Sequence, residues 1–249
     1  MNRPTVWAVL PVKSFACAKR RLASLLDARE RAALAEAMFE DVLQVLVNSP
    51  VLAGTLVVTK DATAAAISRA AGAEVLPDPA EAGLAPAVEH AACSLASAGR
   101  AGMLVVPADL PLITAADIAR IVLAHGRPPA VTLVPASRDG GTNALACSPP
   151  QAVPVFFGED SFRRHQHIAL ELGLIPNVLK LPRLARDIDR PDDLFDLVER
   201  PSATRTHAYL TGTGIAGRLS RLLASGPASS RACSLALAGE PTDTLNPKR

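Results

Sequence analysis

Short apolar runs alternate with amphipathic helical segments along most of this 249-residue chain. The first run, residues 5–12 (TVWAVLPV), has the β-rich composition of a buried strand, and the segment 27–48 then repeats apolar residues at helical spacing. A helix that follows a strand in this way usually connects two parallel strands, because a parallel pair requires a long crossover connection. The alternation therefore predicts an α/β, Rossmann-like fold with a mostly parallel central sheet flanked by helices.

The same signals place the remaining elements. The further predicted strands are 54–59, 73–76, 103–106, 130–136, 143–147 and 178–181, and the further predicted helices are 61–72, 84–98, 114–125, 161–172 and 189–200. The expected N-caps of four of the predicted helices are Asp27 (with Glu30), Asp61, Thr114 (with Asp117) and Asp189. No boundary divides the chain before about residue 205, so we expect one domain over residues 1–224. Residues 225–249, rich in Ala, Ser, Gly and Pro, are expected to be a disordered tail.

Composition excludes several classes of function. A net charge of +2 argues against a nucleic-acid-binding protein, and an aromatic content of 3% leaves few side chains on which bases could stack. No apolar run reaches the roughly 18 residues of a membrane span, and the N-terminus lacks the pattern of a signal peptide. The four cysteines (Cys17, Cys93, Cys147 and Cys233) lack CxxC spacing, which predicts free thiols and a cytoplasmic location.

Two acids follow predicted strands. Asp109 stands between two prolines directly after the strand 103–106, and Asp189 lies in Arg186-Asp187-Ile188-Asp189-Arg190 before a helix. Ligands of open α/β sheets bind beyond the carboxyl ends of the strands, and Mg²⁺ takes one or two carboxylates together with phosphate oxygens. Both acids are therefore candidate metal ligands. The alternatives are a proline-bounded turn for Asp109 and an N-cap for Asp189.

The loop after the first strand is basic. Lys13, Lys19, Arg20 and Arg21 lie within nine residues, in a chain that has 21 arginines and 5 lysines. Cations at the carboxyl end of a strand would offset the charge of a polyphosphate. The loop lacks the glycines and the GK[ST] ending of a Walker A motif. A solvated basic loop is the alternative interpretation.

Two glycine-containing segments remain. Gly140 and Gly141 would let the backbone of the loop 137–142 approach a small anion, or they form an ordinary hairpin turn. Thr142 and Ser161 add hydroxyl donors, and we expect Ser161 to begin a helix whose free N–H groups face that anion. The segment 212–217 (GTGIAG) matches a dinucleotide-binding pattern, but no βαβ unit follows it, so a glycine-interrupted terminal helix is the better interpretation.

Five segments together resemble the CofC/FbiD family. They are VLPVKSFACAKRRL, VVPADLPL, SRDGGTNAL, FGEDSFRRH and DIDRPDDL, spread over residues 5–222, and the most specific parts are DGGTNAL and FGxxSF. The resemblance implies a cytoplasmic, often homodimeric guanylyltransferase of deazaflavin coenzyme biosynthesis. Such an enzyme transfers GMP from GTP to the phosphate of a small phosphorylated carboxylic acid, with Mg²⁺ as cofactor and with release of pyrophosphate.

The resemblance also implies roles for particular positions. The implied catalytic residues are Lys13, Lys19 and Asp109, and the implied nucleotide-binding residues are Pro11, Lys13, Lys19, Arg20, Gly83 and Asp109. Asp109 and Asp189 would hold the magnesium. The acid would contact Thr142, Asn143, Gly158 and Ser161.

The chain departs from the family pattern at one place. Many members read GLNAA where this chain reads Gly83-Leu84-Ala85-Pro86-Ala87, so any guanine contact made by that asparagine would come from elsewhere. The departure favours 3-phospho-D-glycerate as the acid over phosphoenolpyruvate and 2-phospho-L-lactate, which the loop residues themselves do not distinguish.

Two other functions compete with this interpretation. A molybdenum-cofactor or sugar-phosphate nucleotidyltransferase usually carries a glycine-rich first loop, whereas this chain has no glycine between Thr5 and Leu26. A non-catalytic nucleotide-binding domain would not need both Asp109 and Asp189.

Overall fold

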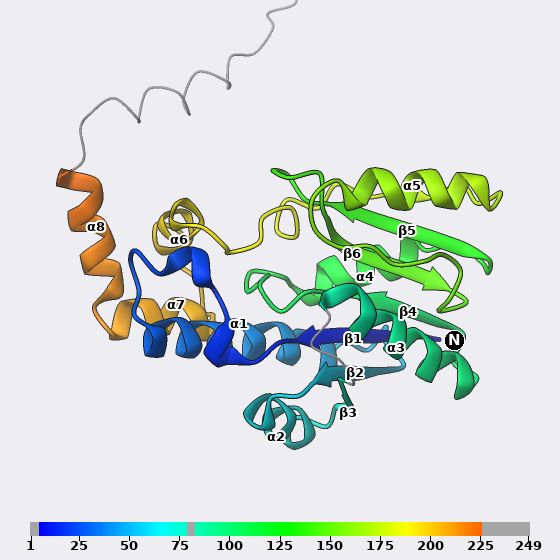
Figure 1. The fold of residues 1–249 in the computed structure, drawn as a ribbon, viewed down its shortest axis with the longest axis horizontal. Coiled ribbons are helices and arrows are strands. Elements are labelled where there is room, and N and C mark those ends of the chain that lie inside the picture. The colour runs from blue at the N-terminus through cyan, green and yellow to red at the C-terminus, as the bar shows by residue number, and fades with distance from the viewer. Residues whose placement is uncertain (1–4, 79–82, 226–249) are drawn as a thin grey trace, which may run out of the picture.

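The computed structural model, which describes residues 5–78 and 83–225, is built around strand β1 (Val6–Val12) at the centre of one sheet (Figure 1). All seven residues of β1 are buried. Successive side chains of a strand point to opposite faces of its sheet, and accordingly Ala8 and Leu10 join one hydrophobic core while Trp7 and Val9 join another. The sheet is therefore covered by helices on both faces, as predicted.

The strand order is β3-β2-β1-β4-β6-β5-β7. The other strands are β2 (Gly54–Thr59), β3 (Glu74–Pro77), β4 (Gly102–Val105), β5 (Ala130–Pro135), β6 (Thr142–Ser148) and β7 (Asn177–Val178). All neighbouring pairs are parallel except those of β6, which runs antiparallel to β4 and β5. The mostly parallel sheet is thus confirmed. Strand β7 is shorter than the predicted 178–181, because the chain already turns at Leu181, whose carbonyl accepts from Leu184 N (3.0 Å).

Five helices cover the two faces. Helices α1 (Ala28–Val47), α2 (Ala62–Ala70) and α4 (Ala115–Ala124) pack on the Ala8 face, and α3 (Leu84–Ser97) and α5 (Ser161–Glu171) pack on the Trp7 face. The caps that the sequence predicts are present at three of them: Asp27 with Glu30 on α1, Asp61 on α2, and Thr114 with Asp117 on α4. Each cap satisfies N–H groups that the helix itself leaves without acceptors.

A third core joins the C-terminal helices to α1. Helices α6 (Pro191–Val198), α7 (Arg205–Gly212) and α8 (Ile215–Ser225) gather beside α1 in Figure 1. Gly214, with φ 73°, separates α7 from α8, so the segment 212–217 is a break between two helices, as predicted. In the described part of the chain, no helix has the length and apolar character needed to cross a membrane. The predicted tail, apart from Ser225, lies outside the described residues.

Candidate active site

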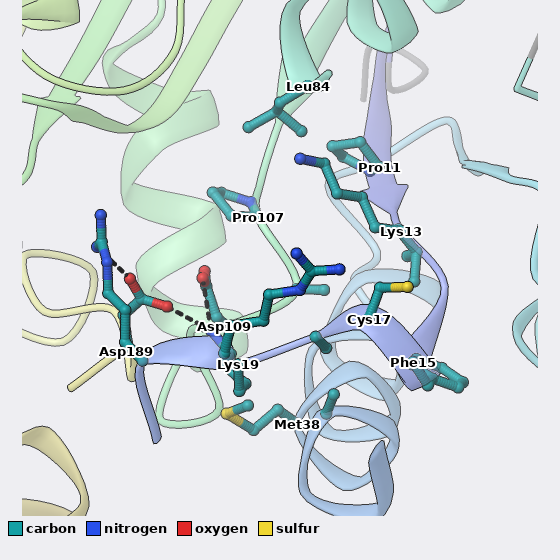
Figure 2. Close-up of a pocket in the computed structure, with 16 residues that line it drawn as sticks. Pro11, Lys13, Phe15, Cys17, Lys19, Met38, Leu84, Pro107, Asp109 and Asp189 are labelled. Atoms are coloured by element: carbon teal, nitrogen blue, oxygen red, sulfur yellow. Dashed lines mark hydrogen bonds and ion pairs between the residues drawn. The ribbon is translucent and has the colours of Figure 1, made fainter. Parts of the chain in front are cut away.

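A cleft of about 420 Å³ opens at the carboxyl ends of β1 and β4 (Figure 2). After β1 the chain continues to β2 and β3 on one side, and it then returns to β4 on the other, so the cleft lies where the strand order reverses. The lining includes six of the predicted residues: Pro11, Lys13, Lys19, Arg20, Asp109 and Asp189. Gly83 precedes α3, and its neighbour Leu84 lines the cleft.

The basic loop folds as two short 3₁₀ helices, η1 (Phe15–Cys17) and η2 (Arg20–Leu22). The backbone N–H of Phe15 donates to Asp61 Oδ2 (3.1 Å), which ties η1 to the start of α2. Between the two short helices, Lys19 adopts φ 52° and ψ 40°. This left-handed conformation is unusual for a residue other than glycine and costs about 1–3 kcal/mol. The strain is consistent with a functional position for the Lys19 side chain, which is only 9% exposed.

Lys19 joins the two acids that the sequence singled out. Its Nζ lies 3.0 Å from Asp109 Oδ2 and 3.6 Å from Asp189 Oδ1. Figure 2 marks such contacts with dashed lines. Arg21 makes a second ion pair with Asp189, at 2.5 Å. In contrast, Asp109 Oδ1 is buried and has no hydrogen-bond partner among the described residues. A buried carboxylate oxygen without a donor is costly unless a cation or a ligand satisfies it.

The prediction that Asp189 is the N-cap of the helix expected at residues 189–200 is wrong. Helix α6 begins at Pro191 and its N-cap is Arg190. The carboxylate of Asp193 accepts from the backbone N–H groups of Asp189 (3.0 Å) and Arg190 (2.7 Å), so it satisfies the donors at this helix end. The Asp189 carboxylate is therefore left to interact with Lys19 and Arg21.

Asp187 is a third acid of the site, and the sequence analysis did not select it. Burial raises the pKa of this carboxyl group above its ordinary value of 3.8, the nearby charge of Asp109 raises it further, and the charge of Lys19 opposes this shift. Ile188, between the two acids, is buried in the third core, and its N–H donates to the carbonyl of Asp109 (3.0 Å). The acid–apolar–acid pattern of residues 187–189 is the signal that could have identified Asp187.

The predicted acid-binding residues form a second group, which does not line the cleft. Thr142, Asn143 and Ser161 are all buried. Thr142 Oγ1 lies 3.0 Å from Nδ1 of His165 and accepts from Ser161 Oγ at 3.3 Å. Asn143 Nδ2 donates to the carbonyl of Leu184 (2.7 Å). This last bond ties the start of β6 to the segment that carries Asp187 and Asp189.

The start of α5 differs from expectation. The helix begins at Ser161, as predicted, but the N–H of Ser161 donates to the carbonyl of Gly158 (3.2 Å) and the N–H of Phe162 donates to that of Gly140 (2.9 Å). These first two donors are therefore not free to face an anion. Gly140 and Gly158 both have positive φ, 66° and 97°, and these turns let the two loops bond to the helix end.

A small hollow lies beside the cleft. It has a volume of about 30 Å³ and shares Arg21 and Asp189 with the cleft. Its other lining residues are Ser137, Arg138 and Asp139 before β6, and Arg186, Asp187, Arg190 and Asp193 before and within α6. Four arginines and four aspartates therefore line this space, which borders the loop leading to Thr142.

Residues 6–225 match the family model described as "Guanylyl transferase CofC like". The chain belongs to this family. It is 41% identical over 199 residues to a phosphoenolpyruvate guanylyltransferase of Roseiflexus sp. strain RS-1, a match that covers 80% of this chain and 87% of the relative. A 3-phospho-D-glycerate guanylyltransferase of Colwellia psychrerythraea is 38% identical over 186 residues, covering 75% of this chain and 88% of the relative.

Solved structures support the fold of this guanylyltransferase. A protein of Desulfovibrio desulfuricans G20, assigned as a nucleotide-diphospho-sugar transferase, superimposes with a TM-score of 0.67 at 16% identity, over 86% of this chain and 97% of that protein. A nucleotidyl transferase of Methanothermobacter gives a TM-score of 0.52 at 18% identity, over 84% of this chain and 99% of that protein. At these identities the likeness concerns the nucleotidyltransferase fold alone.

Proposed function

We propose that this guanylyltransferase transfers GMP from GTP to the phosphate of a three-carbon phosphorylated carboxylic acid, with release of pyrophosphate. The observation that carries the proposal is the cleft in which Lys19 joins Asp109 and Asp189, in a chain that belongs to the CofC-like family. The acid stays a prediction. The sequence favours 3-phospho-D-glycerate, the substrate in the name of the Colwellia relative, whereas the Roseiflexus relative is named for phosphoenolpyruvate.

The donor set of the cleft fits a magnesium ion. Mg²⁺ prefers carboxylate and phosphate oxygens, and Asp109 offers a buried oxygen that has no partner among the described residues. Asp187 lines the adjoining hollow rather than the cleft, and the described residues hold no cluster of three His, Cys, Asp or Glu side chains placed to bind a metal ion. Asp109 and Asp189 would hold the ion, with Asp187 beside them. Mg²⁺ bound there would offset the negative charge of both phosphate groups.

The reaction requires the protein chiefly to position the two substrates and to supply positive charge. A phosphate oxygen of the acid is already anionic at neutral pH, so it needs no general base. It attacks the α-phosphorus of GTP, a new phosphorus–oxygen bond forms, and the bond to the oxygen that bridges to the β-phosphorus breaks. Pyrophosphate leaves with that electron pair. Lys13, Lys19 and Arg20, which line the cleft, would offset the charge that builds up on the leaving pyrophosphate.

The hollow beside the cleft is lined by four arginines and four aspartates. Arg21, Arg138 and Arg186 are ion-paired with Asp189, Asp193 and Asp196. Guanidinium groups bind carboxylates and phosphates through paired hydrogen bonds, so an acid bound there would have to compete with these aspartates. The homodimer and the cytoplasmic location that the resemblance implies stay predictions.

Pyrophosphate release tests the proposal. The enzyme is incubated with GTP, Mg²⁺ and, in turn, 3-phospho-D-glycerate, phosphoenolpyruvate or 2-phospho-L-lactate, and the nucleotide product is identified by mass spectrometry. We expect release with one acid, and a rate lower by about 10²- to 10³-fold in Asp109→Asn, the loss typical of one electrostatic group in an active site. Asp192→Asn, an exposed acid of α6, is the matched control and should keep the wild-type rate.

Two outcomes would contradict the proposal. Pyrophosphate release with a sugar phosphate but with none of the three acids would favour the first rival function. Binding of GTP without turnover in the presence of every acid would favour a non-catalytic nucleotide-binding domain.

A further inference from the structure

His165 is fully buried in α5, yet both of its ring nitrogens contact polar atoms. Its Nε2 accepts from the backbone N–H of Phe156 (3.0 Å), and its Nδ1 lies 3.0 Å from Thr142 Oγ1. The rings of Phe156 and Phe157 lie 5.8 Å and 6.1 Å from the imidazole. No ion pair to this ring is present among the described residues.

The Phe156 contact fixes the tautomer of the ring. A backbone N–H can only donate, so Nε2 must be unprotonated, and the proton of a neutral imidazole is then on Nδ1. His165 therefore donates to Thr142 Oγ1. A protonated ring could not accept the Phe156 bond. Burial lowers the pKa of His165 from 6.5 to about 4, so the ring is neutral at pH 7.

The neighbouring hydroxyl groups of Thr142 and Ser161 then have one O–H without an acceptor in the described part of the chain. Thr142 Oγ1 accepts from His165, and Thr142 and Ser161 share one hydrogen bond of 3.3 Å. In that bond Ser161 Oγ donates and Thr142 Oγ1 accepts, so the O–H of Thr142 is left over. That O–H has no acceptor among the described residues, although both side chains are at most 4% exposed. A buried donor without an acceptor is uncommon and is suited to an anionic ligand.

Three other donors at this place are already engaged. The first two backbone N–H groups of α5 donate to Gly158 and Gly140, and the amide of Asn143 donates to Leu184. The hydroxyl pair is thus the donor that these residues leave for the acceptor acid.

We propose that His165 is a positioning residue: it orients the Thr142–Ser161 hydroxyl pair so that the remaining O–H donates to an anionic oxygen of the acceptor acid. The inference rests on the proposed function, because the acid is the ligand. His165 itself does not touch the reacting atoms, and it acts through Thr142.

Two substitutions of His165 test the two contacts of its ring one at a time. The amide nitrogen of asparagine can stand near the place of Nδ1, so His165→Asn keeps a donor to Thr142. The amide oxygen of glutamine can stand near the place of Nε2, so His165→Gln keeps an acceptor for Phe156 but loses the bond to Thr142. KM for the acid, KM for GTP and kcat are measured for both variants, for Thr142→Val, and for His165→Gln combined with Thr142→Val.

We expect His165→Gln to raise KM for the acid by about 10-fold, the effect of losing one oriented hydrogen bond, while KM for GTP stays unchanged. His165→Asn should stay within about twofold of the wild type for both constants. Thr142→Val should raise KM for the acid as His165→Gln does, and the double variant should be no worse than Thr142→Val, because His165 acts only through the Thr142 hydroxyl.

Three results would overturn the inference. One is an equal rise in KM for the acid in His165→Asn and in His165→Gln, which would mean that the ring only fills space. Another is a loss of kcat with KM for the acid unchanged, and the last is additive effects in the double variant. If the wild-type enzyme releases pyrophosphate with none of the acids, the proposed function itself fails, which is a different result from an active wild type with an unaffected His165→Gln.

Discussion

At the scale of single residues, Lys19 balances the charge of the cleft. Asp109, Asp187 and Asp189 would repel one another without a cation, and Lys19 supplies that cation from a strained backbone position. Burial, and then the charge of Asp109, raises the pKa of Asp187, while the charge of Lys19 lowers it. Phosphate oxygens and a metal ion would therefore enter a site that already holds both signs of charge close together.

His165 should make folding stability depend on pH. Its pKa is 6.5 in the unfolded chain and about 4 in the folded one, so the unfolded state binds the proton more tightly between these values. The contribution of His165 to stability is complete above pH 6.5, and it is lost as the pH falls towards 4. By pH 5 this linkage lowers the free energy of unfolding by about 2 kcal/mol. His125, whose pKa is also lowered by burial, acts in the same direction.

Urea denaturation at pH 7 and pH 5 checks this prediction. We expect His165→Asn to lack about 2 kcal/mol of the wild-type fall in stability. His167→Asn, an exposed residue of the same helix, should keep that fall. An equal fall in the wild type and in His165→Asn would show that His165 does not remain neutral in the folded protein.

At the scale of elements, the local signals of the sequence were sufficient for most of the fold. Apolar runs and the caps at Asp27, Asp61 and Thr114 were enough to locate the central strands and helices, because these depend on local patterns. The signals were insufficient for the exact bounds of some elements. The N-cap of α6 is Arg190 rather than Asp189, and the Asp193 carboxylate accepts from the N–H groups of both. Strand β7 ends at Val178, before the turn that contains Pro182.

The residues of the site could likewise be predicted only in part. Asp109 and the basic loop could be predicted, because acids and cations at strand ends lie at one edge of a parallel sheet. Asp187 and His165 could not be selected in this way. Their importance comes from neighbours far along the chain, Asp109 for the former and Thr142 for the latter.

The junction before α6 should depend on Asp193. Its carboxylate is 4% exposed, accepts from the backbone of Asp189 and Arg190, and pairs with Arg138 at 2.6 Å. Asp193→Ala removes all three of these interactions at once. We expect a loss of about 3 kcal/mol in the free energy of unfolding, and a higher Mg²⁺ concentration for half-maximal rate, because the backbone that carries Asp189 is no longer held.

The neighbouring Asp192 provides the control for that measurement, since it is exposed in the same turn of α6. Asp192→Ala should change stability by at most about 0.5 kcal/mol and leave the Mg²⁺ dependence unaltered. Wild-type stability in Asp193→Ala would mean that Arg190 and the helix dipole suffice to hold this junction.

At the scale of the whole molecule, the sheet couples the cleft to the second group of residues. Strands β1 and β4 end at the cleft, while β6, antiparallel to β4, begins at Thr142. Because β6 runs in the opposite direction, its first residue lies at the same edge of the sheet as the last residue of β4. The antiparallel strand β6 thus places its first residue, Thr142, at the edge of the sheet where the cleft lies. In a purely parallel sheet the first residue of a strand would lie at the opposite edge.

Thiol labelling can follow both the cleft and the global stability of the sheet. Cys17 is exposed and lines the cleft, Cys93 is exposed on α3, and Cys147 is buried in β6 between two strands. Burial raises the pKa of Cys147 to about 12, so almost none of the reactive thiolate is present at pH 8. In a Cys233→Ser variant, which removes the thiol outside the described residues, a disulfide reagent should label Cys17 and Cys93 rapidly. Cys147 should react only as fast as the whole sheet unfolds.

GTP with Mg²⁺ should slow the labelling of Cys17 and leave that of Cys93 unchanged, because only Cys17 borders the cleft. The labelled sites are identified by peptide mass spectrometry at each time point. Equal protection of both exposed thiols would point to a general stabilisation of the fold. Rapid labelling of Cys147 in the native protein would show that β6 separates from β4 or β5 without global unfolding, and the edge that joins the two groups of site residues would then be a mobile one.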